Sequence, residues 1–254
     1  MGFGRYVIYV TGMDLTERKV QILRAIVQEY INTAEAVGSQ TLADEYELNV
    51  SPATLRNEMA DLVEMGYLVK EHVSAGRIPG PMAFRLYIKE LMEEKEIPVV
   101  SEVTIKQRLW EERHDVDQLL RRMVKILAEE AQNLAFIVTD NGRVYHAGSV
   151  HVLRHPEFYN IDLTRTVLHM LDQAEVLASV FERVVPEHEV GVLLADELGI
   201  GGLDQCGLIY AQFTLPYGEH AKMGVLGPIR LNYPRIMPVV RYFKRISDEL
   251  ARVW

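Results

Sequence analysis

The sequence predicts an α+β protein with a mainly helical first half and a second half in which strands and helices are mixed. Two observations support this prediction. Apolar residues recur at three- and four-residue spacing over residues 16–33 and 103–133, which is typical of amphipathic helices. From residue 134 onward, short apolar runs bounded by turn residues predict antiparallel strands, with helices over residues 163–181 and 234–253.

The chain is expected to divide at the run Ile97–Val100, where a proline interrupts a helical pattern. We therefore expect a domain over residues 13–96, a helical linker over 97–133 and an α+β domain over 134–254. The 254 residues allow one or two domains of ordinary size. Residues 1–12, MGFGRYVIYVTG, are expected to be a non-essential extension, either from an upstream translation start or as a short extra strand or arm.

Composition argues against several classes of protein. The formal net charge of −9 argues against sequence-independent binding of nucleic acids, because such binders are normally basic. The single cysteine, Cys206, excludes an intramolecular disulfide and a cysteine-based zinc site, and it fits a reducing cytoplasm. No apolar run approaches the roughly 20 residues that span a bilayer. The first dozen residues lack the features of a signal peptide. We expect a cytoplasmic protein without membrane contact.

The most informative stretch runs from Ser51 to Pro79, SPATLRNEMADLVEMGYLVKEHVSAGRIP. Ser51 is expected to cap a helix, and Pro52 suits its first position. Helical spacing gives this helix one buried stripe, formed by Leu55, Met59, Leu62 and Val63. The opposite face carries small and polar residues, namely Ala53, Thr54, Arg56 and Asn57. Small residues allow close approach to a DNA major groove, and Arg and Asn side chains form the bidentate hydrogen bonds that read guanine and adenine.

The segments on both sides of this helix strengthen that interpretation. Residues 39–46 are expected to form a short helix capped by Ser39, and the turn over 47–50 completes helix-turn-helix spacing. After Gly66, Tyr67–Val69 predicts a strand, and Ser74–Arg77 predicts a tight turn with an arginine at its tip. This turn is typical of the wing in a winged helix, and its Gly76 is expected to adopt a backbone conformation closed to other residues. The alternative is an ordinary surface helix packed on its own domain.

The residues expected to contact DNA lie at the starts of the two helices and in the wing. They are Ser39, Gln40, Thr41, Ser51, Ala53, Thr54, Arg56, Asn57, Ser74, Gly76 and Arg77. The surrounding domain is acidic by count, so DNA contact would depend on these local groups rather than on overall charge. A degenerate winged helix used for protein contact is the second hypothesis.

Two parts of the sequence resemble heat-inducible transcription repressors of the HrcA type. LTERKVQILRAIVQEYINTAEAVGSQTLA followed by VSPATLRNEMADLVEMGYLVKEHVSAGRIP resembles the family's N-terminal domain, and GVLGPIRLNYPRIMPVVRYFKRISDEL, from Gly224 to Leu250, resembles its C-terminal signature. The resemblance implies a repressor that binds, as a homodimer, an inverted-repeat operator in double-stranded DNA upstream of chaperone genes. It further implies coupling to a GroEL-type chaperonin and a GAF-like fold for the C-terminal domain.

The sequence departs from that family in length. One short turn separates Phe136–Thr139 from Gly148, so the family's inserted dimerising domain is missing. We expect dimerisation to use an apolar stripe in the helical linker, formed by Val116, Leu119, Leu120, Met123 and Leu127. The pattern equally allows this stripe to pack on its own C-terminal domain.

Motifs for catalysis are missing from the sequence. No nucleotide fingerprint, phosphate loop or nucleophile elbow appears, and we expect neither enzymatic activity nor a cofactor. His146, His151, His155 and Glu157 are spaced too loosely to predict a metal site. Cys206 is expected to be a buried small residue, because no activating base lies near it in the sequence. A metabolite-responsive regulator that uses the C-terminal domain as a pocket is a further alternative.

Overall fold

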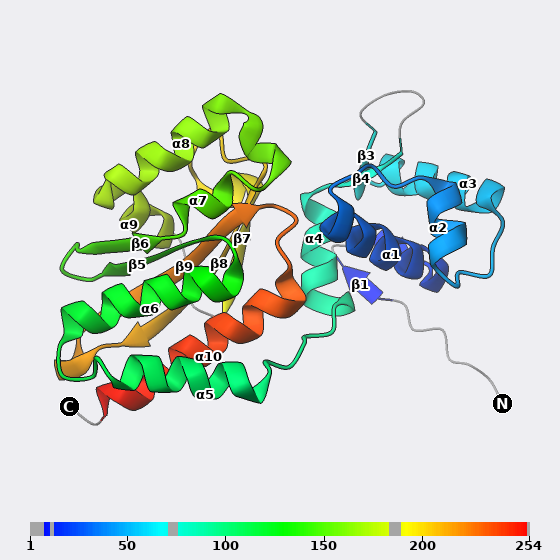
Figure 1. Ribbon diagram of the computed structural model, residues 1–254. Helices are drawn as coiled ribbons and strands as arrows, with labels where there is room; N and C mark the ends of the chain where they lie inside the picture. Colours follow the sequence, from blue (N-terminus) through cyan, green and yellow to red (C-terminus); the bar gives the residue numbers. More distant parts are fainter. Residues whose placement is uncertain (1–7, 11–12, 71–75, 183–188, 253–254) are drawn as a thin grey trace. The chain divides into compact units, whose positions relative to one another are not determined.

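The computed structural model describes residues 8–10, 13–70, 76–182 and 189–252. The chain forms two compact units, Met1–Glu93 and Glu94–Trp254 (Figure 1). Helices and a small hairpin make up the first unit, and an antiparallel sheet with helices makes up the second. The predicted α+β class, with an N-terminal winged helix-turn-helix, is therefore confirmed.

The first unit contains the helices and hairpin expected of a winged helix. Its elements are α1 (Glu17–Thr33), α2 (Ser39–Glu45), α3 (Pro52–Glu64), β3 (Leu68–Val69), β4 (Ile78–Pro79), α4 (Pro81–Leu86) and a π-helical turn, η1 (Tyr87–Leu91). Strand β1 (Ile8–Val10), within the predicted extension, pairs antiparallel with β2 (Met13–Leu15). The core is formed by fully buried side chains from every helix of the unit up to α4, including Ile22, Leu42, Leu55, Leu62 and Phe84.

One helix start in this unit differs from the sequence prediction, and one helix end is irregular. Gly38, not Ser39, is the N-cap of α2, and it makes no side-chain cap hydrogen bond because glycine has no side chain. The fourth helix continues from α4 into η1 and ends at Leu91. Its last turn is widened, and the Met92 N–H donates to the Tyr87 carbonyl oxygen at 2.8 Å, five residues back.

The second unit is built around a five-stranded antiparallel sheet in the order β6-β5-β9-β8-β7. The strands are β5 (Leu134–Thr139), β6 (Val144–Ala147), β7 (Gly191–Leu194), β8 (Cys206–Thr214) and β9 (His220–Pro228). The first and last strands, β5 and β9, lie side by side with Ile137 opposite Met223. Strand β6 therefore forms one edge of the sheet.

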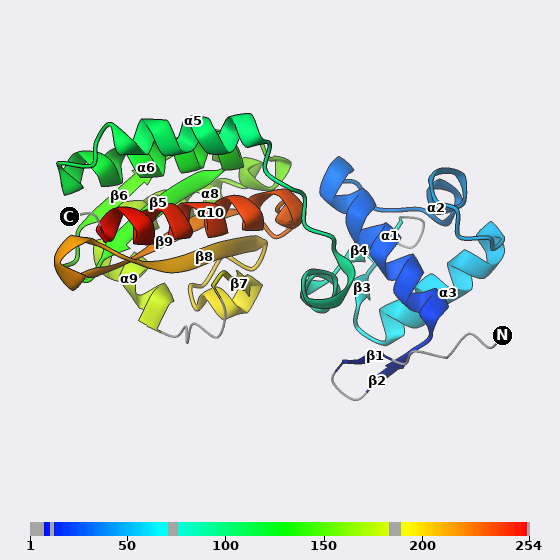
Figure 2. The same ribbon diagram turned by 90° about the horizontal axis from the view of Figure 1, so that it is seen from below.

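Helices cover both faces of this sheet (Figures 1 and 2). One face carries α6 (Val116–Ala131) and α10 (Tyr233–Ala251), with α5 (Val99–Trp110) packed outside them. The other face carries α7 (Ser149–Val152), the 3-10 turn η2 (Pro156–Tyr159), α8 (Ile161–Asp172) and α9 (Ala174–Glu182). Alternate residues of each strand serve the two faces, so Phe136 packs with Phe181 of α9 at a ring separation of 5.8 Å. Two further 3-10 turns, η3 (Ala195–Leu198) and η4 (Pro216–Gly218), follow β7 and β8.

The segment expected to be a linker belongs to this second unit. Helices α5 and α6 are separated at Glu111–Asp115. Helix α6 packs on the sheet and on α10, and α5 packs on α6 and α10. The division between the units falls at Glu93–Glu94, before Ile97, because residues 94 and 95 are held by α10. The Lys95 N–H donates to the Pro234 carbonyl oxygen at 2.8 Å, and Arg241 donates to Glu94, also at 2.8 Å.

The expected dimerisation stripe is buried inside its own subunit. Leu119, Leu120, Met123 and Leu127 are at most 2% exposed, so the stripe has the second of the two arrangements that the sequence allows. The apolar face of α6 is wide, with eight buried residues, and the sheet and α10 cover it. A face of this width is buried within the subunit. The helix expected over 163–181 is also two helices, α8 and α9, which meet at the extended residue Gln173.

Candidate nucleic-acid interface

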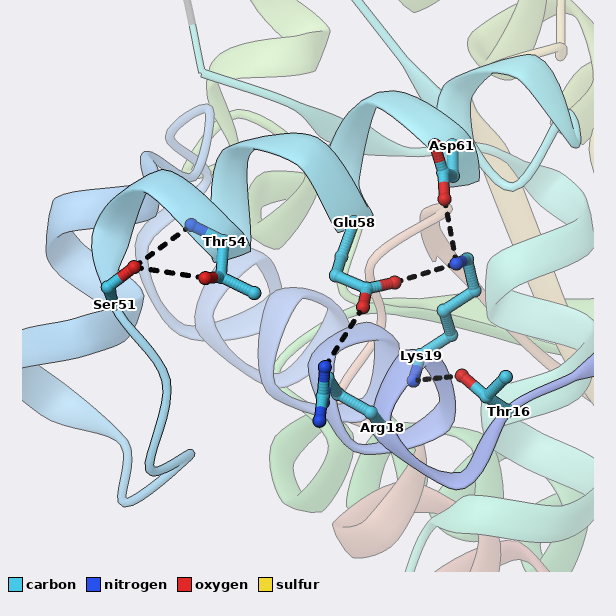
Figure 3. A network of polar contacts seen from close by, with 7 residues as sticks. All are labelled: Thr16, Arg18, Lys19, Ser51, Thr54, Glu58 and Asp61. Atoms are coloured by element: carbon cyan, nitrogen blue, oxygen red, sulfur yellow. Dashed lines mark hydrogen bonds and ion pairs between the residues drawn. The ribbon is translucent and has the colours of Figure 1, made fainter.

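Helix α3 begins as the sequence predicts. The Ser51 hydroxyl oxygen accepts a hydrogen bond from the Thr54 N–H at 3.2 Å and lies 3.0 Å from the Thr54 hydroxyl oxygen (Figure 3). Pro52 occupies the first turn, where its missing N–H leaves no unmet bond. Leu55, Met59 and Leu62 are buried. The cap therefore fixes the start of the helix while its buried stripe fixes the face that remains outside.

The outward face of α3 is small and polar at its N-terminal end. Ala53, Arg56, Asn57 and Ala60 are all exposed, at the spacing of one helix face. Neither the Arg56 nor the Asn57 side chain has a hydrogen bond or ion pair with any residue that the structure describes. Both side chains can therefore bond to an external ligand without breaking an internal contact, and α3 can approach a surface closely between two alanines.

Helix α2 precedes α3 through a turn in which Asn49 adopts the left-handed conformation, with φ of 53°. Gln40 and Thr41 are exposed at the start of α2, whereas Ser39 is half-buried. The Gln40 side chain already has a partner, because its N–H donates to Asp44 at 2.9 Å. Tyr46 at the end of α2 donates to Glu29 of α1 at 2.9 Å, which ties this helix to the scaffold.

A charged network that the sequence analysis did not identify holds α3 against α1. The Lys19 ammonium lies 2.6 Å from Glu58 and 2.8 Å from Asp61, and Arg18 lies 3.5 Å from Glu58 (Figure 3). Hydrogen bonds to Asp61 and then to Glu58 raise the pKa of Lys19. The Lys19 side chain is only 14% exposed. The sequence pattern could not reveal this network, since the lysine and its partners are about 40 positions apart in the chain and meet only in the folded structure.

The wing is joined to the body of the unit through Arg77. The Val37 N–H donates to the Arg77 carbonyl oxygen at 2.9 Å, and the Arg77 N–H donates to the Val37 carbonyl oxygen at 2.8 Å. Arg77 is half-buried at the base of the hairpin rather than at its tip. Ser74, predicted as a DNA contact, lies outside the described residues.

Gly76 is required for a different reason from the one predicted. It does not have a positive φ. A β-carbon at this position would instead lie 2.6 Å from backbone atoms of Ala36 and Val37. The chain therefore needs glycine here because two backbone segments come into close contact, which places residues 36–37 and the wing base in one unit.

The other candidate groups of the sequence lie in the second unit and are occupied or dispersed. Glu157 is paired with Arg230 through two hydrogen bonds of 2.6 and 3.0 Å. Burial lowers the pKa of His155 and raises that of the Cys206 thiol to about 12. Among the described residues no group of three or more metal-ligating side chains comes together. No helix in the described ranges is long and apolar enough to cross a bilayer.

Comparison with known proteins gives a consistent result along the chain. The family model for the HrcA protein C-terminal domain matches residues 82–237. The heat-inducible transcription repressor HrcA of Desulforudis audaxviator is 28% identical over 341 aligned positions, which cover 95% of this chain and 98% of the relative. The HrcA of Pelotomaculum thermopropionicum is 26% identical over 342 positions, with the same coverage. These alignments are longer than the 254 residues of this chain, so the relatives contain residues without a counterpart here.

A solved structure supports the fold. The crystal structure of a protein described as hypothetical superposes with a TM-score of 0.76 at 17% identity, covering 94% of this chain and 98% of that one. Fold and exposed helix face together define a winged-helix protein with an appended α+β domain. The family model covers more than half of the sequence, and the chain belongs to the HrcA family. That family consists of transcription repressors and not of enzymes, as the sequence predicts.

Proposed function

We propose that this protein represses transcription by binding an inverted-repeat operator as a dimer, with α3 of each subunit in the major groove of one half-site. The supporting observation is the outward face of α3, where Arg56 and Asn57 are exposed and engage none of the described residues. Arg pairs with guanine and Asn with adenine through two hydrogen bonds each. The exposed Gln40 and Thr41 at the start of α2 are assigned to the DNA backbone.

The genes under control are assigned from the relatives, whose names describe heat-inducible repressors. We propose that this repressor acts on chaperone genes and that a GroEL-type chaperonin is its partner. The net charge is consistent with sequence-specific rather than sequence-independent DNA binding. A chain of charge −9 is repelled by DNA except where local contacts compensate.

The test is a salt-titrated binding assay on an inverted-repeat operator and on a scrambled duplex of equal length. A specific reader should bind the operator at least about 1,000-fold more tightly at physiological salt. Equal affinity for both duplexes would contradict specific recognition. Failure to bind either one would favour the second candidate, a winged helix used for protein contact.

A further inference from the structure

The first turn of α1 lies against one side of α3, next to the outward face of that helix. Arg18 contacts Glu58 of α3, and the Lys19 ammonium bridges Glu58 and Asp61 (Figure 3). Asp61 lies one helical turn after Asn57 and is 56% exposed, so it stands at the border of the outward face. The start of α1 therefore flanks the reading side chains of α3.

The two basic residues of this turn are held in different ways. The Lys19 side chain is 14% exposed and lies 2.6 Å from Glu58 and 2.8 Å from Asp61. The Arg18 side chain is 55% exposed, and its ion pair with Glu58 is longer, at 3.5 Å. It has no hydrogen bond with a residue that the structure describes. Since such an exposed ion pair contributes little to stability, the Arg18 guanidinium can bind an external group at little cost.

We propose that Arg18 donates to a phosphate of the DNA backbone at the rim of the major groove that receives α3. This inference rests on the proposed function for the position of α3 on DNA. A sugar-phosphate backbone bounds the major groove on each side, so a cation that flanks the reading helix meets phosphates rather than base edges. A guanidinium has five N–H donors and can contact Glu58 and a phosphate oxygen at the same time.

The charges on this flank of α3 require such a contact. Glu58 and Asp61 carry two negative charges beside the outward face, and Lys19 compensates one of them. Without Arg18 the flank would therefore repel the DNA backbone. Glu17 in the same turn of α1 is exposed and adds a further negative charge. Binding at this flank thus depends on a direct hydrogen bond from Arg18 rather than on long-range attraction.

A salt-titrated binding assay on a duplex with one half-site tests this contact. Loss of one phosphate contact lowers the slope of log affinity against log salt by about 0.9. Arg18→Ala should show this change and bind about 10-fold more weakly at about 50 mM salt. Arg18→Lys keeps the positive charge and should retain the slope. An unchanged slope in Arg18→Ala would overturn the assignment.

Arg24→Ala is the matched control for the loss of an arginine. Arg24 lies on the same helix, is 45% exposed and is bonded to Glu93 at 2.9 Å. This variant should leave the salt slope unchanged, because Arg24 lies almost two turns further along α1. Equal slopes for Arg18→Ala and Arg24→Ala would show an effect of overall charge and overturn a direct contact.

A second background tests whether Arg18 acts only by holding α3 through Glu58. Glu58→Gln removes the ion pair, while the new amide oxygen can still accept from Lys19. In this background Arg18→Ala should still lower the slope by about 0.9. An effect that disappears in the Glu58→Gln background would make Arg18 a support of α3 and overturn the phosphate contact. Thermal melts of Arg18→Ala should match the wild type, because the side chain is exposed.

Comparison of operator and scrambled duplex separates this inference from the proposed function. A phosphate contact predicts that Arg18→Ala loses the same factor on both duplexes. Wild-type preference for the operator with an unchanged slope in Arg18→Ala would contradict the contact and leave the repressor in place. Equal wild-type affinity for both duplexes, with a lower slope in Arg18→Ala, would do the reverse. A loss confined to the operator would make Arg18 a base contact and overturn its assignment to the backbone.

Discussion

Helices α3 and α6 have similar N-terminal caps but different surroundings, because α3 keeps one face exposed and α6 is mostly buried. Each begins with a side-chain cap: Ser51 accepts from Thr54 at 3.2 Å and Asp115 accepts from Gln118 at 3.1 Å. Each has an apolar stripe and a polar face. Helix α3 buries only Leu55, Met59 and Leu62, whereas α6 buries eight residues between the sheet and α10. An amphipathic pattern therefore predicts which face of a helix is buried. The surrounding elements decide whether the opposite face is available for binding.

The largest expected effect tests the scaffold role of α6. Met123 is 0% exposed and accepts a hydrogen bond from Ser247 at 3.6 Å. Met123→Ala should lower the free energy of unfolding by about 2–5 kcal/mol, because a cavity remains in a packed core. Urea unfolding followed by circular dichroism measures this loss. Lys125→Ala, at an exposed position of the same helix, is the control and should stay within about 0.5 kcal/mol of wild type. If Met123→Ala were equally mild, α6 would not be a buried scaffold helix.

The next effect concerns recognition by α3. Arg56→Ala should weaken operator binding by about 1–3 kcal/mol, because two hydrogen bonds to a base are lost. Stability should not change, since the Arg56 side chain is exposed and has no hydrogen bond or ion pair with a residue that the structure describes. Lys89→Ala removes one exposed positive charge from the same unit and serves as the control for charge alone. Equal losses for both variants in a fluorescence anisotropy titration would show that α3 contributes only charge.

The next prediction compares the addition of a β-carbon at the crowded Gly76 with the same change at an uncrowded glycine, Gly38. Gly76→Ala should lower stability by about 1–3 kcal/mol, because its β-carbon would overlap backbone atoms at 2.6 Å. Gly38→Ala is the matched change, since its β-carbon would meet Thr41 at an ordinary 3.6 Å. Thermal unfolding of the two variants provides the comparison. A larger loss at Gly38 would contradict the close approach of the wing base to residues 36–37.

The smallest effect concerns the support of α3. Lys19→Met keeps the length of the side chain but removes its ion pairs with Glu58 and Asp61. We expect a loss of about 1 kcal/mol in stability, because Asp61 is 56% exposed and water screens the pair. Operator affinity should fall by less than for Arg56→Ala, since the reading side chains remain. Chemical denaturation and anisotropy titration check both numbers, and an operator loss larger than that of Arg56→Ala would make Lys19 a contact residue.

Much of the interface could be predicted because it is local in sequence. The cap at Ser51, the proline after it and the exposed Arg56 and Asn57 are set by residues within one or two helical turns. The network of Lys19 was not predicted, because no pattern relates positions about 40 residues apart. Arg77 was placed at the wing tip because a turn motif does not reveal its backbone pairing with Val37.

The sequence by itself determined the amphipathic helices α1, α3 and α10, the presence of antiparallel strands after residue 134 and the residues that face outward on α3, since periodicity and capping act over a few neighbouring positions. Only the tertiary structure decided what covers the stripe of α6, where the two units divide and which strand remains at the edge of the sheet. These outcomes depend on contacts between distant segments. The physical reason is that an apolar face gains free energy from any apolar partner, so its pattern requires burial without specifying the surface that provides it.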